Sequence, residues 1–301
     1  MDFALQTSGS YDTVLTAARW AEDRGLVCLA LPDHYFLGLG EEGLKRPALD
    51  AFAQLAGLAI ETSTIQLSVL VSPITFRHPA VLYKTGVTLD QMSGGRFTLG
   101  IGTGWLEAEH EYFGFPFPPV SERFDLMEEA LGYVHAALHG KAFSGEHYSL
   151  KEHDYQPKAM GLRIVVGGTG AHKTPRLAGE YADEFNCYPG PGLSDRIARA
   201  RQAAHDAGRD AGSMLISSAG QVIVEETRAE VEDRIDAIAA EADMTREQLD
   251  AEFEKRSTPR GTVDEVRSQL EEMVGLGIRR FYLQGEFKPE ELARTFDLLQ
   301  G

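Results

Sequence analysis

Two runs of apolar residues in the first third of the chain predict buried strands joined by a helix. The runs Ile65–Val71 and Phe97–Ile101 consist mainly of β-branched and apolar residues, and the first is nearly continuous in hydrophobicity. Such runs are typical of parallel strands whose two faces are both covered. Pro79 lies near the start of the helix between them, where its missing N–H costs nothing, and Gly94-Gly95 break the chain before the second strand. This stretch therefore predicts one βαβ unit.

The same alternation of apolar runs and helical patterns continues along the whole chain. Eight strand candidates, nearly all separated by helices, occur in 301 residues. This count favours a closed (β/α)8 TIM barrel that forms a single domain over residues 1–301, with an open doubly wound sheet as the competing architecture. The predicted strands are Asp2–Thr7, Val27–Leu31, Ile65–Val71, Phe97–Ile101, Arg163–Gly167, Asp183–Cys187, Met214–Val224 and Ile278–Leu283.

Helical stripes and capping residues mark the segments between the strands. Thr227 and Glu230 have the spacing of a capping box and predict the start of one helix. Residues 140–161 are expected to form an irregular connection, and residues 242–259 an insertion with a short helix of its own. The clearest amphipathic stripe consists of Phe124, Met127, Leu131, Val134 and Leu138.

Composition excludes several classes of partner. The net charge is −17, from 29 basic and 46 acidic residues, and no basic run is present. Nucleic acid is therefore not an expected partner. No apolar run approaches a membrane span, and nothing near residue 1 resembles a signal peptide. A cytoplasmic protein without a membrane partner is expected.

Metal chemistry is not expected either. Cys28 and Cys187 lie in apolar strand contexts without metal-ligand spacing, which predicts buried, reduced thiols. The chain contains no HExxH, HxH or GxSxG motif. A zinc hydrolase or a serine esterase on this barrel is therefore disfavoured.

The ends of the predicted strands should meet at one face of the barrel and form the active site. Asp33-His34 is the pair of titratable side chains at a strand end with the clearest chemical use. A histidine there can protonate a substrate oxygen or a ring nitrogen near neutral pH. The alternative is that Asp33 caps the following loop and His34 only fills space. Other residues expected at this face are Gln6, Val71-Ser72, Gly102–Trp105, Gly167–Gly170, Asn186 and Gln284.

Two glycine-rich loops at this face are candidate ligand contacts. Gly167–Gly170 follows a strand and precedes a helix, so its N–H groups can bind a phosphate, although a plain tight turn explains the pattern equally well. Gly102–Trp105 can lie against a flat ring, with core packing of Trp105 as the alternative. Glu107, Glu109, His110 and Glu111 follow. They can supply an acid or base, but such a charge run is more typical of a solvated face.

The motifs together resemble those of the bacterial luciferase-like monooxygenase superfamily, in particular its branch of oxidoreductases that use coenzyme F420. The resemblance covers nearly the whole chain. The segments that carry it are AEDRGLVCLALPDH, VSPITFRHPAVLYK, LDQMSGGRFTLGIGTGW, ERFDLMEEAL, GEHYSL, IVVGGTGAHKTPRLAGEYADEFN and GTVDEVRSQLEEMVGLGIRRFYL. It implies a (β/α)8 barrel, often a homodimer, that binds a flavin or deazaflavin at the carboxyl ends of its strands.

The resemblance also implies roles for individual residues. Asp33 and His34 would lie beside the deazaflavin ring. A bulge at Val69-Leu70-Val71, often with a non-prolyl cis peptide, would support the ring from behind. Gly104 and Trp105 would flank the ring, and Gly168-Thr169-Gly170 would hold the phosphate. Trp105 stands where relatives carry an acid, which leaves Glu107 or Glu109 as a displaced proton donor.

The activity implied is hydride transfer between F420 and a small organic substrate, with His34 as the proton partner. The aromatic loop Tyr112–Phe117 and the loop Tyr35–Arg46 would line an apolar substrate pocket. An FMN-dependent monooxygenase on the same barrel is the nearest alternative. A non-catalytic flavin- or deazaflavin-binding protein is an alternative of another class.

Overall fold

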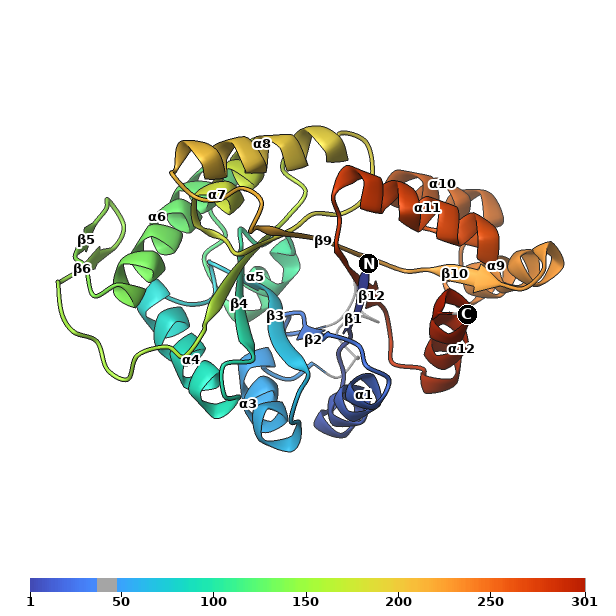
Figure 1. Cartoon of the computed structure of the whole chain (residues 1–301), viewed down its shortest axis with the longest axis horizontal. Helices are drawn as coiled ribbons and strands as arrows, with labels where there is room; N and C mark the ends of the chain where they lie inside the picture. Colours follow the sequence, from blue (N-terminus) through green and yellow to red (C-terminus); the bar gives the residue numbers. More distant parts are fainter. Residues whose placement is uncertain (37–47, 301) are drawn as a thin grey trace.

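The computed structural model of the chain describes residues 1–36 and 48–300. Eight parallel strands close into a barrel in the order β1-β12-β9-β8-β7-β4-β3-β2 (Figure 1). This closure confirms the predicted (β/α)8 barrel and rules out the open sheet. The barrel strands are β1 (Asp2–Gln6), β2 (Cys28–Leu31), β3 (Gln66–Pro73), β4 (Phe97–Gly102), β7 (Arg163–Gly167), β8 (Glu184–Asn186), β9 (Leu215–Gly220) and β12 (Arg280–Gln284).

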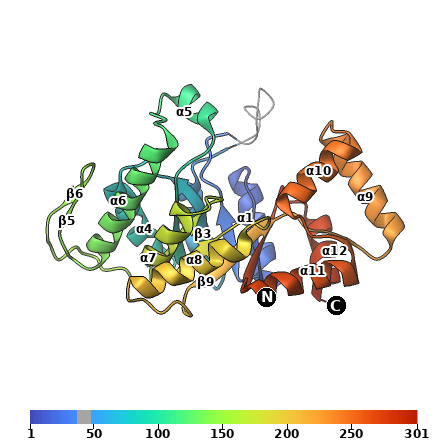
Figure 2. The same cartoon turned by 90° about the horizontal axis from the view of Figure 1, so that it is seen from above.

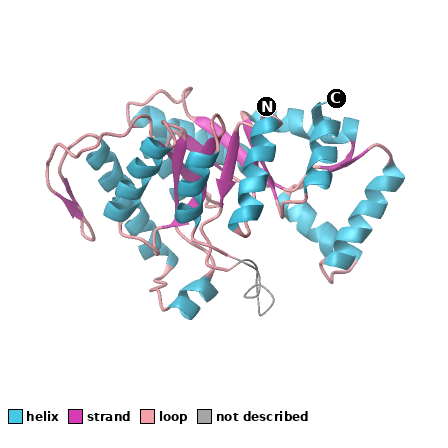
Figure 3. Ribbon diagram, turned by 90° about the horizontal axis from the view of Figure 1, so that it is seen from below, coloured by secondary structure: helices cyan, strands magenta, loops and turns pink. Residues whose placement is uncertain are grey.

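Helices surround the strands, and both chain termini lie on the side where β1 begins (Figures 2 and 3). The amphipathic stripe predicted for the long helix is confirmed, since Met127, Leu131 and Val134 are buried. The helices of the described residues are α1 (Tyr11–Asp23), α3 (Ala51–Glu61), α4 (Pro79–Met92), α5 (Glu107–Phe113), α6 (Val120–Leu138), α7 (Lys173–Tyr181), α8 (Leu193–Asp206), α9 (Arg228–Glu241), α10 (Arg246–Arg256), α11 (Val263–Leu276) and α12 (Pro289–Gln300).

Alternate residues of each barrel strand face inward or outward. On β1, Leu5 belongs to the large core between strands and helices, whereas Ala4 belongs to a smaller cluster inside the barrel. On β12, Phe281 belongs to the large core and Tyr282 to the cluster inside the barrel. The period of two explains why the strands read as continuous apolar runs, because both faces are buried.

A buried polar network fills the end of the barrel where the strands begin. The Arg280 guanidinium donates to a carboxylate oxygen of Glu184 at 3.1 Å and to Oε1 of Gln66 at 2.9 Å. The Tyr282 hydroxyl donates to the other Glu184 oxygen at 3.0 Å. Burial raises the pKa of the neighbouring Cys28 thiol to about 12. The prediction that both cysteines are buried thiols is confirmed.

The seventh predicted strand and the predicted insertion need correction. The run Met214–Val224 divides into β9 and a separate strand β10 (Ile223–Glu225), which pairs in parallel with β11 (Arg260–Thr262) outside the barrel. Between β10 and β11 lie α9 and α10, which share a separate apolar cluster and stand beside the barrel (Figures 1 and 2). The excursion therefore spans residues 223–262 and not only 242–259. The capping box of Thr227 and Glu230 is confirmed.

The predicted irregular connection contains a short antiparallel hairpin, β5 (Phe143–Ser144) and β6 (Ser149–Leu150). Glu129 on α6 accepts hydrogen bonds from three N–H groups of its turn, which holds the hairpin against that helix. Within residues 1–36 and 48–300, no helix is long and apolar enough to cross a membrane. The same residues contain no group of three or more His, Cys, Asp or Glu side chains arranged to hold a metal ion.

Candidate active site at the carboxyl ends of the strands

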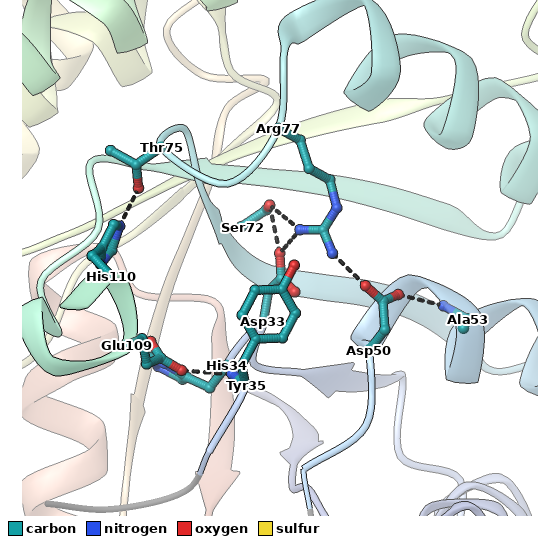
Figure 4. Close-up of polar contacts among 10 residues, drawn as sticks. All are labelled: Asp33, His34, Tyr35, Asp50, Ala53, Ser72, Thr75, Arg77, Glu109 and His110. Atoms are coloured by element: carbon teal, nitrogen blue, oxygen red, sulfur yellow. Dashed lines mark hydrogen bonds and ion pairs between the residues drawn. The ribbon is translucent and has the colours of Figure 1, made fainter. Parts of the chain in front are cut away.

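The carboxyl ends of β2, β3 and β4 bring charged side chains together at one end of the barrel, which we call the barrel mouth. Pro32–His34 follow β2, Arg77 follows β3, and Glu109 lies on α5, the helix after β4. Figure 4 shows these side chains converging from three separate segments of the chain. The position agrees with the general rule that barrels carry their chemistry at this end.

Asp33 is a buried carboxylate held by a serine and an arginine. The Ser72 hydroxyl donates to its Oδ2 at 2.6 Å, and the Arg77 guanidinium pairs with the same oxygen. Arg77 also pairs with Asp50, so it bridges two carboxylates (Figure 4). Burial raises the pKa of Asp33, and Arg77 and Ser72 act in the opposite direction. The role of Arg77 was not predicted, because nothing in the sequence links it to Asp33.

Two buried oxygen atoms at the mouth have no hydrogen-bond partner among the described residues. They are Oδ1 of Asp33 and Oγ1 of Thr7, which follow the neighbouring strands β2 and β1. Buried polar atoms are normally paired, so an orphan at a barrel mouth indicates a position where a ligand or a water completes the set.

His34 and Glu109 form a hydrogen-bonded pair. Nδ1 of His34 lies 2.8 Å from Oε2 of Glu109, and the other carboxylate oxygen accepts from the N–H of Tyr35 at 2.6 Å. Because an ionised carboxylate only accepts, Nδ1 of His34 carries the proton and donates it. The second ring nitrogen, Nε2, is not bonded to any described residue. This arrangement, a histidine oriented by a buried acid, is suited to moving a proton at Nε2.

The charge run after β4 was predicted to be a solvated face. In the structure, only part of it is exposed. Glu107 and Glu111 are exposed, but Glu109 is 1% exposed and His110 is 2% exposed. Nδ1 of His110 lies 2.9 Å from the Leu106 carbonyl and Nε2 lies 2.6 Å from the Thr75 hydroxyl, so both of its nitrogens are occupied. Of the two predicted acids, the structure therefore brings Glu109 to His34 and leaves Glu107 on the surface.

Trp105 is not a core residue. Its side chain is 66% exposed, and its ring packs edge-on against His34 with 5.7 Å between centroids. The adjacent Gly104 adopts a φ of +77°, and its carbonyl accepts from Arg123 at 2.6 Å. Trp105 is thus positioned at the open side of His34, where it can flank a planar ligand.

An aromatic wall forms around Tyr35, the residue that follows His34. Tyr35 stacks on Phe76 with 4.7 Å between centroids, and it contacts Phe113 at 5.1 Å. Tyr112 and Phe113 are half-exposed or more. Of the two loops predicted to line a substrate pocket, residues 112–117 contribute to this wall, whereas residues 37–46 of the other lie outside the described part of the chain.

The bulge predicted in β3 is present. The register of β3 against β4 shifts between Val69 and Ser72, and the Leu70–Val71 peptide bond is cis. The Leu70 carbonyl accepts from the amide of Gln6 at 2.6 Å, and Gln284 donates to Gln6 at 2.8 Å. These amides connect the bulge to β1 and β12 across the barrel mouth.

Three glycines make room for the Val71 side chain that the bulge turns inward. A Cβ atom would lie 2.9 Å from Val71 if placed on Gly100, 2.6 Å if placed on Gly102, and 2.9 Å if placed on Gly167. Real Cβ contacts are not this short, so these inward positions on β4 and β7 require glycine. The glycines of the FTLGIGTGW segment therefore accommodate a side chain, in addition to any role in approaching a ligand.

Gly102→Ala is expected to destabilise the fold by about 1–3 kcal/mol through overpacking against Val71, and to weaken coenzyme binding. Urea unfolding and coenzyme titration measure the two effects. Adding Val71→Ala should recover most of the stability, because the clashing methyl groups are removed. Gly275→Ala is the control, since a Cβ there meets no atom within 4 Å. A double variant no more stable than Gly102→Ala would contradict this account.

The loop Gly168-Thr169-Gly170 opens toward the start of α7. Gly168 has a φ of +154°, and the helix begins without a side-chain cap from a described residue. The first N–H groups of a helix need partners from outside it. Arg196, which is 6% exposed, donates to the Tyr188 carbonyl at 2.9 Å and lies 3.5 Å from the Thr169 carbonyl. This loop can bind a phosphate, and no motif along the chain indicated that Arg196 supports it.

A closed parallel barrel with a histidine–acid pair, a strand bulge and a glycine-rich loop at its mouth has the layout of a barrel enzyme whose site lies at the carboxyl ends of the strands. The chain belongs to the luciferase-like monooxygenase family, whose model matches residues 2–285. Members of this family bind a reduced flavin or coenzyme F420. The predicted family is therefore confirmed.

Several known proteins are similar to this chain. Pyrimidine monooxygenase RutA of Escherichia coli O44:H18 (strain 042 / EAEC) is 28% identical over 261 residues, which cover 83% of this chain and 69% of that protein. Monooxygenase RslO1 from Streptomyces bottropensis matches with a TM-score of 0.79 and 22% identity, covering 99% of this chain and 97% of its own. An F420-dependent secondary alcohol dehydrogenase matches with a TM-score of 0.76 and 20% identity, covering 94% and 92%. The two structures establish the shared fold.

Proposed function

We propose that the chain is an oxidoreductase that binds coenzyme F420 at the barrel mouth and exchanges a hydride with a small organic substrate. The observation that carries this proposal is the contact between His34 and the buried Glu109, 2.8 Å apart. Exchange of hydride with a carbonyl or alcohol also requires a proton to be added to or removed from oxygen. A histidine oriented by a hydrogen bond to a buried acid is suited to that step.

The residues at the mouth fit a flavin-like ring. The bulge at Leu70-Val71 would support one face of the ring, and Trp105 would flank it from the open side. The orphaned oxygens of Asp33 and Thr7 can pair with polar atoms of the ring edge. Gly168–Gly170 and the N–H groups at the start of α7 would hold the phosphate.

When bound, a deazaflavin supplies a ring carbon that passes hydride and reacts poorly with oxygen. The chain's own residues would then orient the substrate, exclude water and handle the proton. Nε2 of His34, which no described residue bonds, would do so, while Glu109 would keep Nδ1 protonated. The aromatic wall of Tyr35, Phe76 and Phe113 would exclude water from the substrate side.

An FMN-dependent monooxygenase is the second candidate function. It is favoured by the 28% identity to a pyrimidine monooxygenase, which exceeds the identity to the F420-dependent structures. The same ring and phosphate contacts would serve FMN. The fold and the histidine–acid pair are compatible with both cofactors.

Fluorescence titration of the purified protein with F420 and with FMN separates the two candidates. Tight binding of F420 and weak binding of FMN, followed by oxidation or reduction of bound F420 in a substrate panel, would support the proposal. The opposite preference, with oxygen uptake in the presence of reduced FMN, would establish the monooxygenase. Tight binding of either cofactor with no turnover across the panel would indicate a non-catalytic cofactor-binding protein.

Gly168→Val is expected to weaken binding of the phosphorylated coenzyme by about tenfold or more. This loss corresponds to the free energy of one or two hydrogen bonds to a charged group. The φ of +154° at this position disfavours a β-branched residue, so the loop would change shape. The affinity for the same ring system without its phosphate should change little. Equal weakening of both ligands would mean that the phosphate lies elsewhere. Gly275→Ala again provides the control for a glycine outside the site.

A further inference from the structure

A chain of hydrogen bonds at the barrel mouth ends on the hydroxyl of Tyr188. Gln6 donates from Nε2 to the Leu70 carbonyl at 2.6 Å, and Gln284 donates from Nε2 to Oε1 of Gln6 at 2.8 Å. The same nitrogen of Gln284 lies 3.3 Å from the Tyr188 hydroxyl and donates to it. The chain of hydrogen bonds therefore joins the bulge of β3 to a residue that follows β8.

The direction of this chain is fixed at the bulge, because a carbonyl oxygen can only accept. The Leu70 carbonyl requires an N–H, so Gln6 turns its amide nitrogen toward the bulge and its oxygen toward Gln284. Gln284 must then present its own nitrogen, and the Tyr188 oxygen accepts from it. The Tyr188 O–H is left as a donor, and within residues 1–36 and 48–300 it has no acceptor.

The surroundings hold Tyr188 in place. Arg196 donates to its carbonyl at 2.9 Å, and its ring packs against the cluster inside the barrel that contains Leu70 and Ala219. A hydroxyl whose oxygen accepts a hydrogen bond is also polarised and becomes a stronger donor. The O–H is therefore an oriented donor before any ligand binds, which lowers the entropy cost of using it.

Tyr188 lies across the mouth from His34. It comes two residues after the end of β8, and His34 comes three residues after the end of β2. Three barrel strands separate β8 from β2 in either direction, so the two strands are opposite each other. The bulge belongs to β3, the neighbour of β2. A planar ligand that lies against the bulge would therefore have His34 on one side and Tyr188 on the other.

We infer that the Tyr188 hydroxyl donates a hydrogen bond to a carbonyl oxygen of the bound coenzyme ring. The inference rests on the proposed function, which places a flavin-like ring against the bulge. Flavins and deazaflavins both carry ring carbonyls, which accept hydrogen bonds and cannot donate them. Tyr188 supplies the complementary donor, and hydrogen bonds to the ring are one means by which a protein tunes such a cofactor.

Tyr188→Phe tests this contact, because it removes the hydroxyl and keeps the ring that packs inside the barrel. Fluorescence titration of the full chain should show about 3- to 10-fold weaker binding of F420 or FMN, whichever the unmodified protein prefers, as expected for the loss of one hydrogen bond. The ring system without its phosphate should lose affinity by the same factor. The visible absorption band of the bound coenzyme should also shift, because a conjugated carbonyl loses its donor.

Two further variants separate the hydroxyl from general effects of substitution. Tyr155→Phe is the control, since the Tyr155 hydroxyl donates to the Lys151 carbonyl at 2.6 Å in the connection between α6 and β7. It should leave coenzyme affinity unchanged. Gln284→Leu keeps the hydroxyl but removes the amide that orients it. Its effect on coenzyme affinity should be smaller in the Tyr188→Phe background than alone, because the two residues act through one contact.

The outcomes distinguish this inference from the proposed function. Unchanged coenzyme affinity in Tyr188→Phe, or an equal loss in Tyr155→Phe, would overturn the inference and leave the proposed function intact. A higher KM for the substrate with unchanged coenzyme affinity would assign the hydroxyl to the substrate and would also overturn it. If the unmodified protein binds neither F420 nor FMN, the proposed function fails and this inference fails with it.

Discussion

His34→Ala is expected to lower the rate of hydride transfer by about 100- to 10,000-fold, the usual contribution of a positioned acid or base. The side chain is partly exposed at the mouth and contacts Glu109 and Trp105, not the apolar core. Stability should therefore remain near that of the unmodified protein. Single-turnover measurements with bound coenzyme give the rate directly, and a coenzyme titration shows whether binding is retained.

Glu109→Gln tests whether the acid acts through His34. The amide cannot keep Nδ1 of His34 protonated as a carboxylate does, and we expect a roughly 10- to 100-fold loss, as found for groups that orient functional histidines. Glu111→Gln on the same helix is the matched control, because Glu111 is exposed. If the Glu109 and Glu111 variants turn over equally well, the pair has no part in the chemistry. Normal turnover in His34→Ala would remove His34 as well.

Arg77→Ala is expected to destabilise the protein by about 3–5 kcal/mol, the cost of leaving a buried charge without its partner. Asp33 is 1% exposed, and Arg77 is its cationic partner. Arg77 also packs over the Phe52 ring at 4.6 Å, so the substitution removes apolar contact too. Urea unfolding at neutral pH measures the effect.

The pH dependence of this variant follows from the same geometry. Burial raises the pKa of Asp33, and loss of Arg77 would raise it further. A carboxyl whose folded pKa is raised binds more protons in the folded state, so its stability contribution decreases as the pH rises through that pKa. The destabilisation should therefore be smaller at acid pH than at neutral pH.

Two further variants define the source of the effect. Adding Asp33→Asn to Arg77→Ala should recover part of the loss at neutral pH, since no buried charge remains. Arg19→Ala is the control, because its pair with Glu61 is exposed and should contribute less than about 1 kcal/mol. An Arg77→Ala protein as stable as the Arg19→Ala protein would show that Asp33 does not depend on its ion pair.

The positions of the barrel strands could be predicted because burial on both faces produces a local signal. Runs such as Ile65–Val71 and Phe97–Ile101 consist mainly of apolar and β-branched residues and end near glycine or proline. The run Met214–Val224 shows the limit of that signal. A strand-like run does not indicate where the chain leaves the barrel, and here the chain leaves after Gly220, so that β10 pairs with β11.

The candidate site was predictable only where it follows directly from strand ends. Asp33 and His34 were located because parallel strands in a barrel end at one face. Glu109 and His110 were expected in a solvated run, and they are buried. Their burial depends on the segments after β2 and β3 that pack against α5, and local sequence does not encode that contact.

The barrel and the glycine and histidine motifs at the strand ends could be read from the amino-acid sequence alone, because period, propensity and spacing act over a few residues. The family was predicted from the resemblance of the motifs along the chain. Only the tertiary structure decided that Glu109 rather than Glu107 contacts His34, that Arg77 neutralises Asp33, and that three glycines accommodate Val71. Each of these contacts joins segments that lie more than 25 residues apart in the sequence. The closure of the barrel brings such segments together, and a contact of this kind leaves no pattern along the chain.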